Sequence, residues 1–185
     1  LTGLPFEELK AQVARTEREL LVLLPKPLDR RGERRRSPLL EAAYLARRLA
    51  EAGLKGLVFA GARKSAELIA RYAAHPLVRP YRAGYTARER RRLEADLKEG
   101  RVRVLVSTSA LELGVDIGEL DAVVLVGYPG STAAFWQRAG RAGRGERRAL
   151  LVYIPREDPM DEYFLHRPAL LLESPPEEAV ADPQN

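Results

Sequence analysis

The sequence contains no cysteine, and only two of its 185 residues are histidine, at His75 and His166. Without cysteine the chain has neither disulfide bonds nor metal sites built on thiolates. Each histidine is isolated, which favours an ordinary surface or core role over that of a base or a metal ligand. A chain without cysteine fits a reducing compartment, so we expect a cytoplasmic location.

Long apolar stretches are also missing. No run approaches the roughly 18 residues that a membrane-spanning helix needs. Near the first residue, Glu7 and Glu8 stand where a signal peptide would have a basic region leading into an apolar one. The sequence therefore predicts no membrane partner.

The motifs of common catalytic sites are absent as well. The segment GARKS (61–65) contains Lys-Ser, but Arg63 stands where a GxxxxGK[ST] phosphate loop needs its second glycine. The segment DEYF (161–164) begins like an acidic magnesium box, yet it follows Pro and Met in a predicted helix instead of an apolar strand. No Ser-His-Asp set and no pair of catalytic carboxylates stands out. Alone, the chain is expected to hold neither Mg²⁺ nor a nucleoside triphosphate.

What the chain does have is apolar content and positive charge. Hydrophobic residues make up 45% and charged residues 31%, which is typical of a globular domain. The net charge is +5, and arginine runs such as RRGERRR (30–36) and RERRR (88–92) carry much of it. This balance favours a polyanionic partner, because the planar guanidinium binds phosphate through two N–H groups. A GC-rich genome or a heat-adapted surface explains the arginine excess equally well.

Apolar segments alternate with amphipathic ones along the chain. Several apolar segments have no polar face, which indicates strands in a sheet covered on both sides. The alternation predicts βαβ units, and hence an α/β fold of three αβα layers around a mostly parallel sheet. Strands are predicted at 20–25, 54–60, 78–81, 102–108, 121–127 and 148–155, and helices at 37–53, 63–75, 86–100, 131–144 and 158–172.

Capping residues mark where several helices begin. Ser37, Thr86 and Ser131 are expected to cap the helices that follow them, and Glu89 completes a capping box with Thr86. Gly53 is expected to end the first of these helices.

We divide the chain into three parts. Residues 1–36 are expected to be a connecting segment with a helix and an edge strand, 37–155 a compact lobe, and 156–185 a closing helix with an extended tail. The first residue is Leu1, and no evident stop follows ADPQN. We therefore expect a fragment of a longer protein, with a further domain after it.

Loops suited to phosphate follow several of the predicted strands. Ligands of parallel sheets bind outside the carboxyl ends of the strands, which singles out FAGARKS, YRAGY, STSALELGVD and GYPGST. In these loops Arg63 and Lys64 begin a helix, Gly84 permits a close backbone approach, and Thr108 stands at a strand-to-helix turn. Each feature alone is weak, but their occurrence at one sheet edge predicts a phosphate-binding face.

The segment QRAGRAGR (137–144) has an unusual arginine spacing. Arg138, Arg141 and Arg144 recur every three residues, with Gly140 and Gly143 among them. Each glycine costs a helix about 1 kcal/mol relative to alanine, and a buried core would not contain the arginines. An anion opposite the run is the expected reason for it.

Together these segments resemble the motifs of superfamily 2 helicases. The stretch VLVSTSALELGVDIGELDAVVLVGYPGSTAAFWQRAGRAGR is similar to motifs V and VI, LVFAGARKSAEL to motif IV, and YRAGY to the motif between IV and V. Within the superfamily, YRAGY, ALELGVDIG, GYPGS and DPMDEYFLHRP resemble the bacterial YprA (MrfA) group of DNA helicases, which are implicated in repair and related to the yeast RecQ-four-like helicase. The resemblance implies the second RecA-like lobe of a DEAD/DEAH-box helicase.

The resemblance also implies nucleotide-binding roles. The N-terminal RecA-like lobe of the same polypeptide would hold ATP and Mg²⁺, and Arg141 and Arg144 would reach the γ-phosphate as arginine fingers with exposed side chains. Gln137 would orient the attacking water or touch the γ-phosphate. Gly114 and Asp116 would border the nucleotide, although Asp116 also suits a turn or an ion pair with arginine.

Nucleic acid is the expected macromolecular partner, single-stranded or partly duplex, and DNA rather than RNA. Such contacts are made to the backbone and carry no sequence information. Gly61 and Ala62 stand where many relatives have a hydroxyl or a larger polar residue, so the resemblance implies that one contact is missing here. The isolated lobe is expected to be monomeric. The residues implied in phosphate contacts are Arg63, Gly84 and Thr108, with Ser107 and Lys64 behind them.

Two other hypotheses differ in class. One is an ATP-independent nucleic-acid-binding module that uses the basic helix at 86–100. The other is a dinucleotide-binding fold, but AGRAGRG lies in and after a helix, not between a strand and a helix, so its context is wrong. Phe135 and Trp136 are able to stack on bases, although a core role for them fits an amphipathic helix better.

Overall fold

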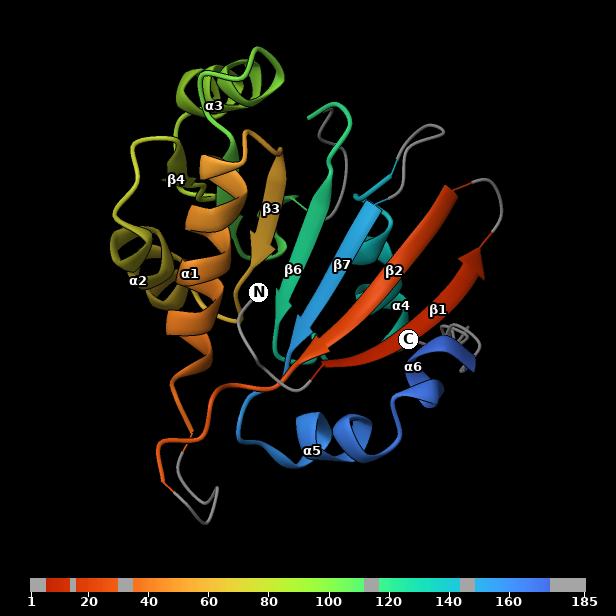
Figure 1. Cartoon of the computed structure of the whole chain (residues 1–185). Helices are drawn as coiled ribbons and strands as arrows, with labels where there is room; N and C mark the ends of the chain where they lie inside the picture. The colour runs from red at the N-terminus through yellow and green to blue at the C-terminus, as the bar shows by residue number, and fades with distance from the viewer. Residues whose placement is uncertain (1–5, 14–15, 30–34, 112–116, 144–148, 174–185) are drawn as a thin grey trace, which may run out of the picture.

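The chain folds around one mixed sheet. The computed structural model describes residues 6–13, 16–29, 35–111, 117–143 and 149–173, drawn in colour in Figure 1. Its seven strands lie in the order β1-β2-β7-β6-β3-β5-β4. Neighbours pair in parallel except β1, which is antiparallel to β2. The strands are β1 Phe6–Val13, β2 Thr16–Leu23, β3 Gly56–Phe59, β4 Val78–Pro80, β5 Val104–Ser107, β6 Ala122–Val126 and β7 Ala149–Ile154.

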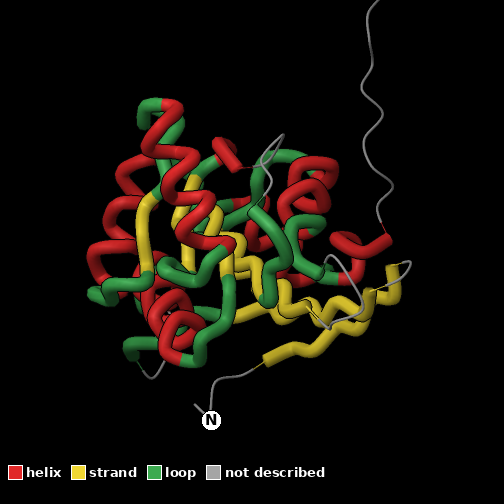
Figure 2. Tube along the Cα trace, turned by 90° about the horizontal axis from the view of Figure 1, so that it is seen from above, coloured by secondary structure: helices red, strands yellow, loops and turns green. Residues whose placement is uncertain are grey.

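Helices cover both faces of this sheet, as Figure 2 shows. One buried cluster joins the sheet to α1 and α2, and a second cluster joins its other face to α3, α4, α5 and α6. The predicted three-layer αβα architecture with a mostly parallel sheet is therefore confirmed. The helices are α1 Pro38–Glu51, α2 Arg63–Ala73, α3 Ala87–Lys98, α4 Thr132–Ala139, α5 Pro159–His166 and α6 Ala169–Glu173, with a 3₁₀ turn η1 at Ser109–Leu111.

The central strands are apolar because neither of their faces meets water. Every residue of β3, β5 and β6 is buried. Side chains alternate between the two faces: Leu57 joins the cluster under α4, and Val58 joins the cluster under α1. Burying each such aliphatic side chain stabilises the fold by about 1.5–3 kcal/mol. Small residues bring α1 close to the sheet, since its buried face includes Ala42, Ala46 and Ala50.

Two of the three predicted helix caps are confirmed. The Thr86 hydroxyl accepts from the Glu89 amide at 3.2 Å, and the Glu89 carboxylate accepts from the Thr86 amide at 2.7 Å, which completes the capping box. The hydrogen bonds that the Glu89 carboxylate accepts from the amide and the hydroxyl of Thr86 lower the pKa of Glu89. The Ser131 hydroxyl accepts from the Ala134 amide at 3.1 Å. Ser37 precedes α1 but makes no side-chain cap. Gly53 ends α1 in a left-handed conformation, as predicted.

The helix predicted within residues 1–36 is wrong for the described part of that segment. Residues of good helix propensity, such as Glu, Leu, Lys and Ala, fill 6–13 and 16–23, yet these segments pair as the strands β1 and β2. The strand β2 pairs with β7 from Arg18↔Ala149 to Val22↔Tyr153. Pairing with a distant strand therefore overrides the local propensity. The division at residues 37 and 155 stays a prediction.

Two predicted helices are shorter than expected. The helix predicted at 131–144 ends at Ala139, with Gly140 as its C-cap. The closing helix predicted at 158–172 is broken into α5 and α6 at Arg167, whose φ of −140° is not helical. Proline disfavours helical geometry in the preceding residue, and Pro168 supplies that effect here. Among the described residues, no helix has both the length and the apolar character needed to cross a membrane.

Candidate functional site

The phosphate-suited loops meet at the carboxyl edge of the sheet, as predicted. The Ala60 amide donates to the Ser107 carbonyl at 2.8 Å, and the Tyr81 amide donates to the Val106 carbonyl at 2.8 Å. The Gly127 amide donates to the Ile154 carbonyl at 2.9 Å. Parallel pairing thus places the ends of five strands in one row, and Figure 1 shows α5 running beneath the arrowheads of β6 and β7.

The first turn of α2 carries positive charge at this edge. Arg63 and Lys64 are both exposed there, and the turn contains no acidic residue. The N-cap residue, Ala62, has no side chain able to accept a hydrogen bond from the turn. Helix N-terminal amides attract anions, and two cations beside them strengthen the attraction. This turn is suited to a phosphate group.

The remaining predicted phosphate contacts differ in exposure. Gly84 is exposed in the loop after β4, and Thr108 is partly exposed at the end of β5. Ser107 is 0% exposed, and its hydroxyl has no hydrogen-bond partner among the described residues. The predicted role of Ser107 is therefore wrong for its side chain, because the register of β5 points that side chain into the interior.

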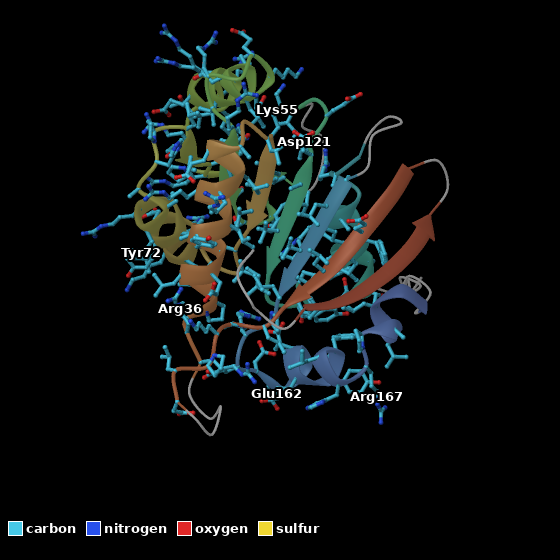
Figure 3. All side chains as sticks on the ribbon, in the orientation of Figure 1. Arg36, Lys55, Tyr72, Asp121, Glu162 and Arg167 are labelled. Carbon is cyan, nitrogen blue, oxygen red and sulfur yellow. The ribbon has the colours of Figure 1, made fainter. Side chains whose placement is uncertain are left out.

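The arginine run leads from the carboxyl edge toward the opposite edge of the sheet. The helix α4 returns from the carboxyl edge, and the Gly143 amide donates to the Leu120 carbonyl at 3.1 Å, just before β6 begins. Figure 3 shows this amino edge at Lys55 and Asp121. Gly143 is needed because its φ is +70°, whereas Gly140 has an ordinary φ of −64°.

The residues of the run are not equivalent. Arg141 is only 9% exposed and has a partner within the fold, so the expectation that its side chain is exposed is wrong. Gln137 is exposed on α4. The Arg138 guanidinium carbon lies 5.3 Å from the centroid of the Phe59 ring, a cation–π distance that indicates a structural contact. Gly114, Asp116 and Arg144, for which nucleotide contacts are predicted, lie outside the described residues.

Phe135 and Trp136 anchor α4, as predicted. Phe135 is fully buried, with its ring centroid 5.8 Å from that of Tyr153. The Trp136 indole N–H donates to the Leu171 carbonyl at 2.9 Å. Both rings are thereby used in packing within the fold.

Sequence reasoning missed a buried carboxylate beneath the carboxyl edge. Asp161 of α5 is 0% exposed, and it accepts hydrogen bonds from the Tyr128 amide at 2.7 Å and from the Tyr153 hydroxyl. The Arg156 Nε lies 3.3 Å from its other oxygen. Burial is the main cause that raises the pKa of Asp161, and the same burial raises the pKa of Tyr153. The sequence did contain a signal for this burial, because Asp161 stands three residues before Phe164 and so lies on the same face of the helix.

This carboxylate holds the loop after β6 in place. Besides the hydrogen bond to the Tyr128 amide, the Tyr128 ring lies 4.5 Å from the Phe164 ring, centroid to centroid. The segment DEYF, which begins like a magnesium box, is thus used for packing and hydrogen bonding. Among the described residues, no group of three His, Asp or Glu side chains is placed to hold a metal ion.

Comparison with known proteins gives a consistent result. The model of the helicase conserved C-terminal domain matches residues 39–146. The chain is 36% identical over 194 residues to the uncharacterized ATP-dependent helicase YprA of Bacillus subtilis (strain 168), covering 100% of this chain and 26% of that protein. It is 36% identical over 162 residues to the ATP-dependent helicase hrq1 of Schizosaccharomyces pombe, covering 82% of this chain and 15% of that protein.

A solved structure agrees with these relatives. The crystal structure of the DUF1998 helicase MrfA bound to DNA and AMPPNP has a TM-score of 0.76 and 36% identity, covering 87% of this chain and 23% of that chain. The present chain spans about a quarter of the length of YprA and a smaller share of hrq1 and MrfA. The match over most of the lobe, on the fold described above, shows that the chain belongs to the helicase conserved C-terminal domain family, as the second RecA-like lobe of a superfamily 2 helicase similar to YprA, hrq1 and MrfA.

Proposed function

We propose that this lobe is the second motor half of an ATP-dependent DNA helicase or translocase. In this proposal its carboxyl edge holds the phosphates of a single strand, and its arginine run serves ATP held by a first lobe. The observation that carries the proposal is the placement of the two groups: exposed Arg63 and Lys64 lie at the carboxyl edge, whereas the described part of the run reaches Gly143, beside Leu120 at the amino edge.

A motor needs its ATP contacts and its nucleic-acid contacts on one rigid lobe. When the two lobes close on ATP, the nucleic-acid contacts of this lobe then move together relative to the first lobe. ATP supplies the phosphoryl group whose transfer drives the cycle. The guanidiniums of Arg141 and Arg144 stabilise charge on the γ-phosphoryl oxygens, and Gln137 orients the attacking water. Two of the relatives are named as ATP-dependent helicases, and MrfA binds DNA and AMPPNP. A role in DNA repair rests on the family resemblance alone.

The proposed nucleic-acid face is tested with the 185-residue chain and a labelled oligothymidine. We expect weak binding whose affinity falls steeply with salt. Arg63→Gln is expected to lower the slope of log affinity against log salt by about 0.7, the value for one phosphate contact on a single strand. Fluorescence anisotropy at several salt concentrations measures this slope, and a thermal melt checks that the variant folds.

The matched control is Arg48→Gln. Arg48 is an exposed arginine whose Nη1 lies 2.9 Å from Glu51, near the end of α1 and thus away from the carboxyl edge. Its replacement is expected to leave the slope unchanged. A change in sequence preference for Arg63→Gln, with no change in slope, would contradict a backbone contact.

A second prediction concerns ATP. The chain alone is expected to show no ATP turnover and negligible ATP affinity, because the sequence contains no phosphate loop and the described residues include no metal-ligand cluster. A phosphate-release assay with Mg²⁺ and single-stranded DNA measures this. Turnover that stays constant per mole of chain through repeated purification would contradict the two-lobe assignment.

One observation favours a second function. The helix α3 exposes Arg88, Arg91 and Arg92, which would suit an ATP-independent nucleic-acid-binding module. In a polypeptide where this lobe is joined to a first lobe, the motor predicts that AMPPNP changes DNA affinity, whereas the module predicts no change.

A further inference from the structure

The side chain of Arg156 crosses the carboxyl edge from the end of β7. It passes over Gly127, where a Cβ atom would overlap the guanidinium, and it reaches Gly61, where a Cβ atom would lie 3.1 Å from Nη1. Gly127 also has a φ of +81°, a conformation that side chains other than glycine rarely adopt. Two glycines in separate loops thus make room for one arginine.

Two carboxylates fix the direction of this guanidinium. Nη2 lies 2.8 Å from Asp158, and Nε lies 3.3 Å from Asp161. Asp161 is itself held by the Tyr128 amide and the Tyr153 hydroxyl, so it does not move with the arginine. Fixing Nε and Nη2 orients the plane of the group toward the loop after β3.

The face of Arg156 that points toward Gly61 is available. A guanidinium has five N–H donors, and the two carboxylates use Nε and one donor of Nη2. Nη1 has no hydrogen-bond partner among the residues that the structure describes, and the side chain is 44% exposed. The neighbouring turn of α2 contains Arg63 and Lys64 and no acidic residue. An anion bound at that turn would therefore lie beside the two N–H donors of Arg156 Nη1, whose direction is already fixed.

We propose that Arg156 is a phosphate-binding residue of the nucleic-acid path, which donates from the β7–α5 turn into the space that the missing side chain of Gly61 leaves open. This inference rests on the proposed function, since it assumes a strand along the carboxyl edge. The ligand is a phosphodiester group, and the contact is independent of base sequence. The residue lies outside the helicase motifs and the matched family range of 39–146.

The experiment measures binding of the 185-residue chain to oligothymidine by fluorescence anisotropy at several salt concentrations. Arg156→Gln is expected to lower the slope of log affinity against log salt by about 0.7, which corresponds to about a fivefold loss at 0.1 M salt. Arg156→Lys is expected to retain the slope, since a lysine still neutralises a phosphate. Arg48→Gln is the matched control, an exposed and ion-paired arginine at the other edge.

A second variant does not depend on the fold tolerating the loss of Arg156. Gly61→Asn keeps the arginine and adds an uncharged acceptor next to Nη1, and Gly61 does not have a positive φ that would strain the new residue. It is expected to lower the slope as Arg156→Gln does. Thermal melts of each variant show whether the fold is kept.

The outcomes separate this inference from the function beneath it. If Arg63→Gln lowers the slope while Arg156→Gln and Gly61→Asn do not, the proposal for Arg156 fails and the proposed function stands. If none of the three changes the slope, the path along the carboxyl edge is wrong. Arg156→Gln could instead lower the affinity and the melting temperature while the slope stays unchanged, with no recovery in Arg156→Lys. That result would mean that the arginine only stabilises the loops, and it would overturn the proposal.

Discussion

Arg141→Ala and Arg144→Ala, made in a polypeptide that joins this lobe to a first lobe, are each expected to lower ATP turnover by about 10³-fold or more. ATP binding is expected to stay largely intact, because the first lobe makes the ground-state contacts. The arginines act when charge moves onto the γ-phosphoryl oxygens in the transition state. Steady-state turnover and the affinity for a labelled nucleotide measure the two effects separately.

Lysine is expected to be a poor replacement at both positions, since a point charge on a flexible stem lacks the planar fork. Arg138→Ala is the matched control within the same run. Its guanidinium packs on the Phe59 ring, so turnover is expected to change no more than a few-fold. Turnover near the wild-type value for both Arg141→Ala and Arg144→Ala would contradict the arginine-finger assignment.

The burial of Arg141 adds an effect on stability. Because this side chain is 9% exposed and has a partner in the fold, Arg141→Ala is expected to lower the free energy of unfolding by about 1–3 kcal/mol. A thermal melt of the 185-residue chain measures this. Loss of stability with full turnover in the two-lobe polypeptide would mean that Arg141 holds the fold and does not serve the chemistry.

Asp161→Ala is expected to be among the most destabilising substitutions in the lobe. It leaves the Tyr128 amide and the Tyr153 hydroxyl without their acceptor, and it removes the carboxylate beside Arg156 Nε. Unpaired buried donors and a broken ion pair together cost about 3–5 kcal/mol. A melting temperature about 6–20 °C lower follows for a domain of this size. Glu162→Ala, at the exposed neighbouring position of α5 in Figure 3, is the control and is expected to change little.

Asp161→Asn is expected to cost less than Asp161→Ala near neutral pH. The raised pKa of Asp161 means that folding favours its uncharged form more than the unfolded chain does. Its contribution to stability is therefore full below the unfolded pKa and is lost as pH rises through the raised folded value. Thermal melts across this pH range are expected to show that the stability of the wild type falls with rising pH and that the stability of Asp161→Asn does not fall in this way. Equal slopes would contradict the raised pKa.

The sequence alone determined the architecture of the lobe. The apolar runs of β3, β5 and β6, the glycine that ends α1 and the capping box of Thr86 and Glu89 act within a few residues, so local pattern is enough to place them. The rule that ligands meet the carboxyl ends of parallel strands then brought Arg63, Gly84 and Thr108 to one edge. These features follow from periodicity and chain direction, which the sequence contains in full.

Only the tertiary structure decided the first strands and the exposure of the site residues. The hairpin of β1 and β2 depends on pairing with β7, far along the chain, which outweighs a local preference for helix. The register of β5 buries Ser107, and packing buries Arg141 although arginine is usually exposed. Arg156 meets Gly61 and Gly127 because three strands end side by side. Each outcome depends on contacts between residues distant in sequence, and the free energy of such contacts is not encoded in any single segment.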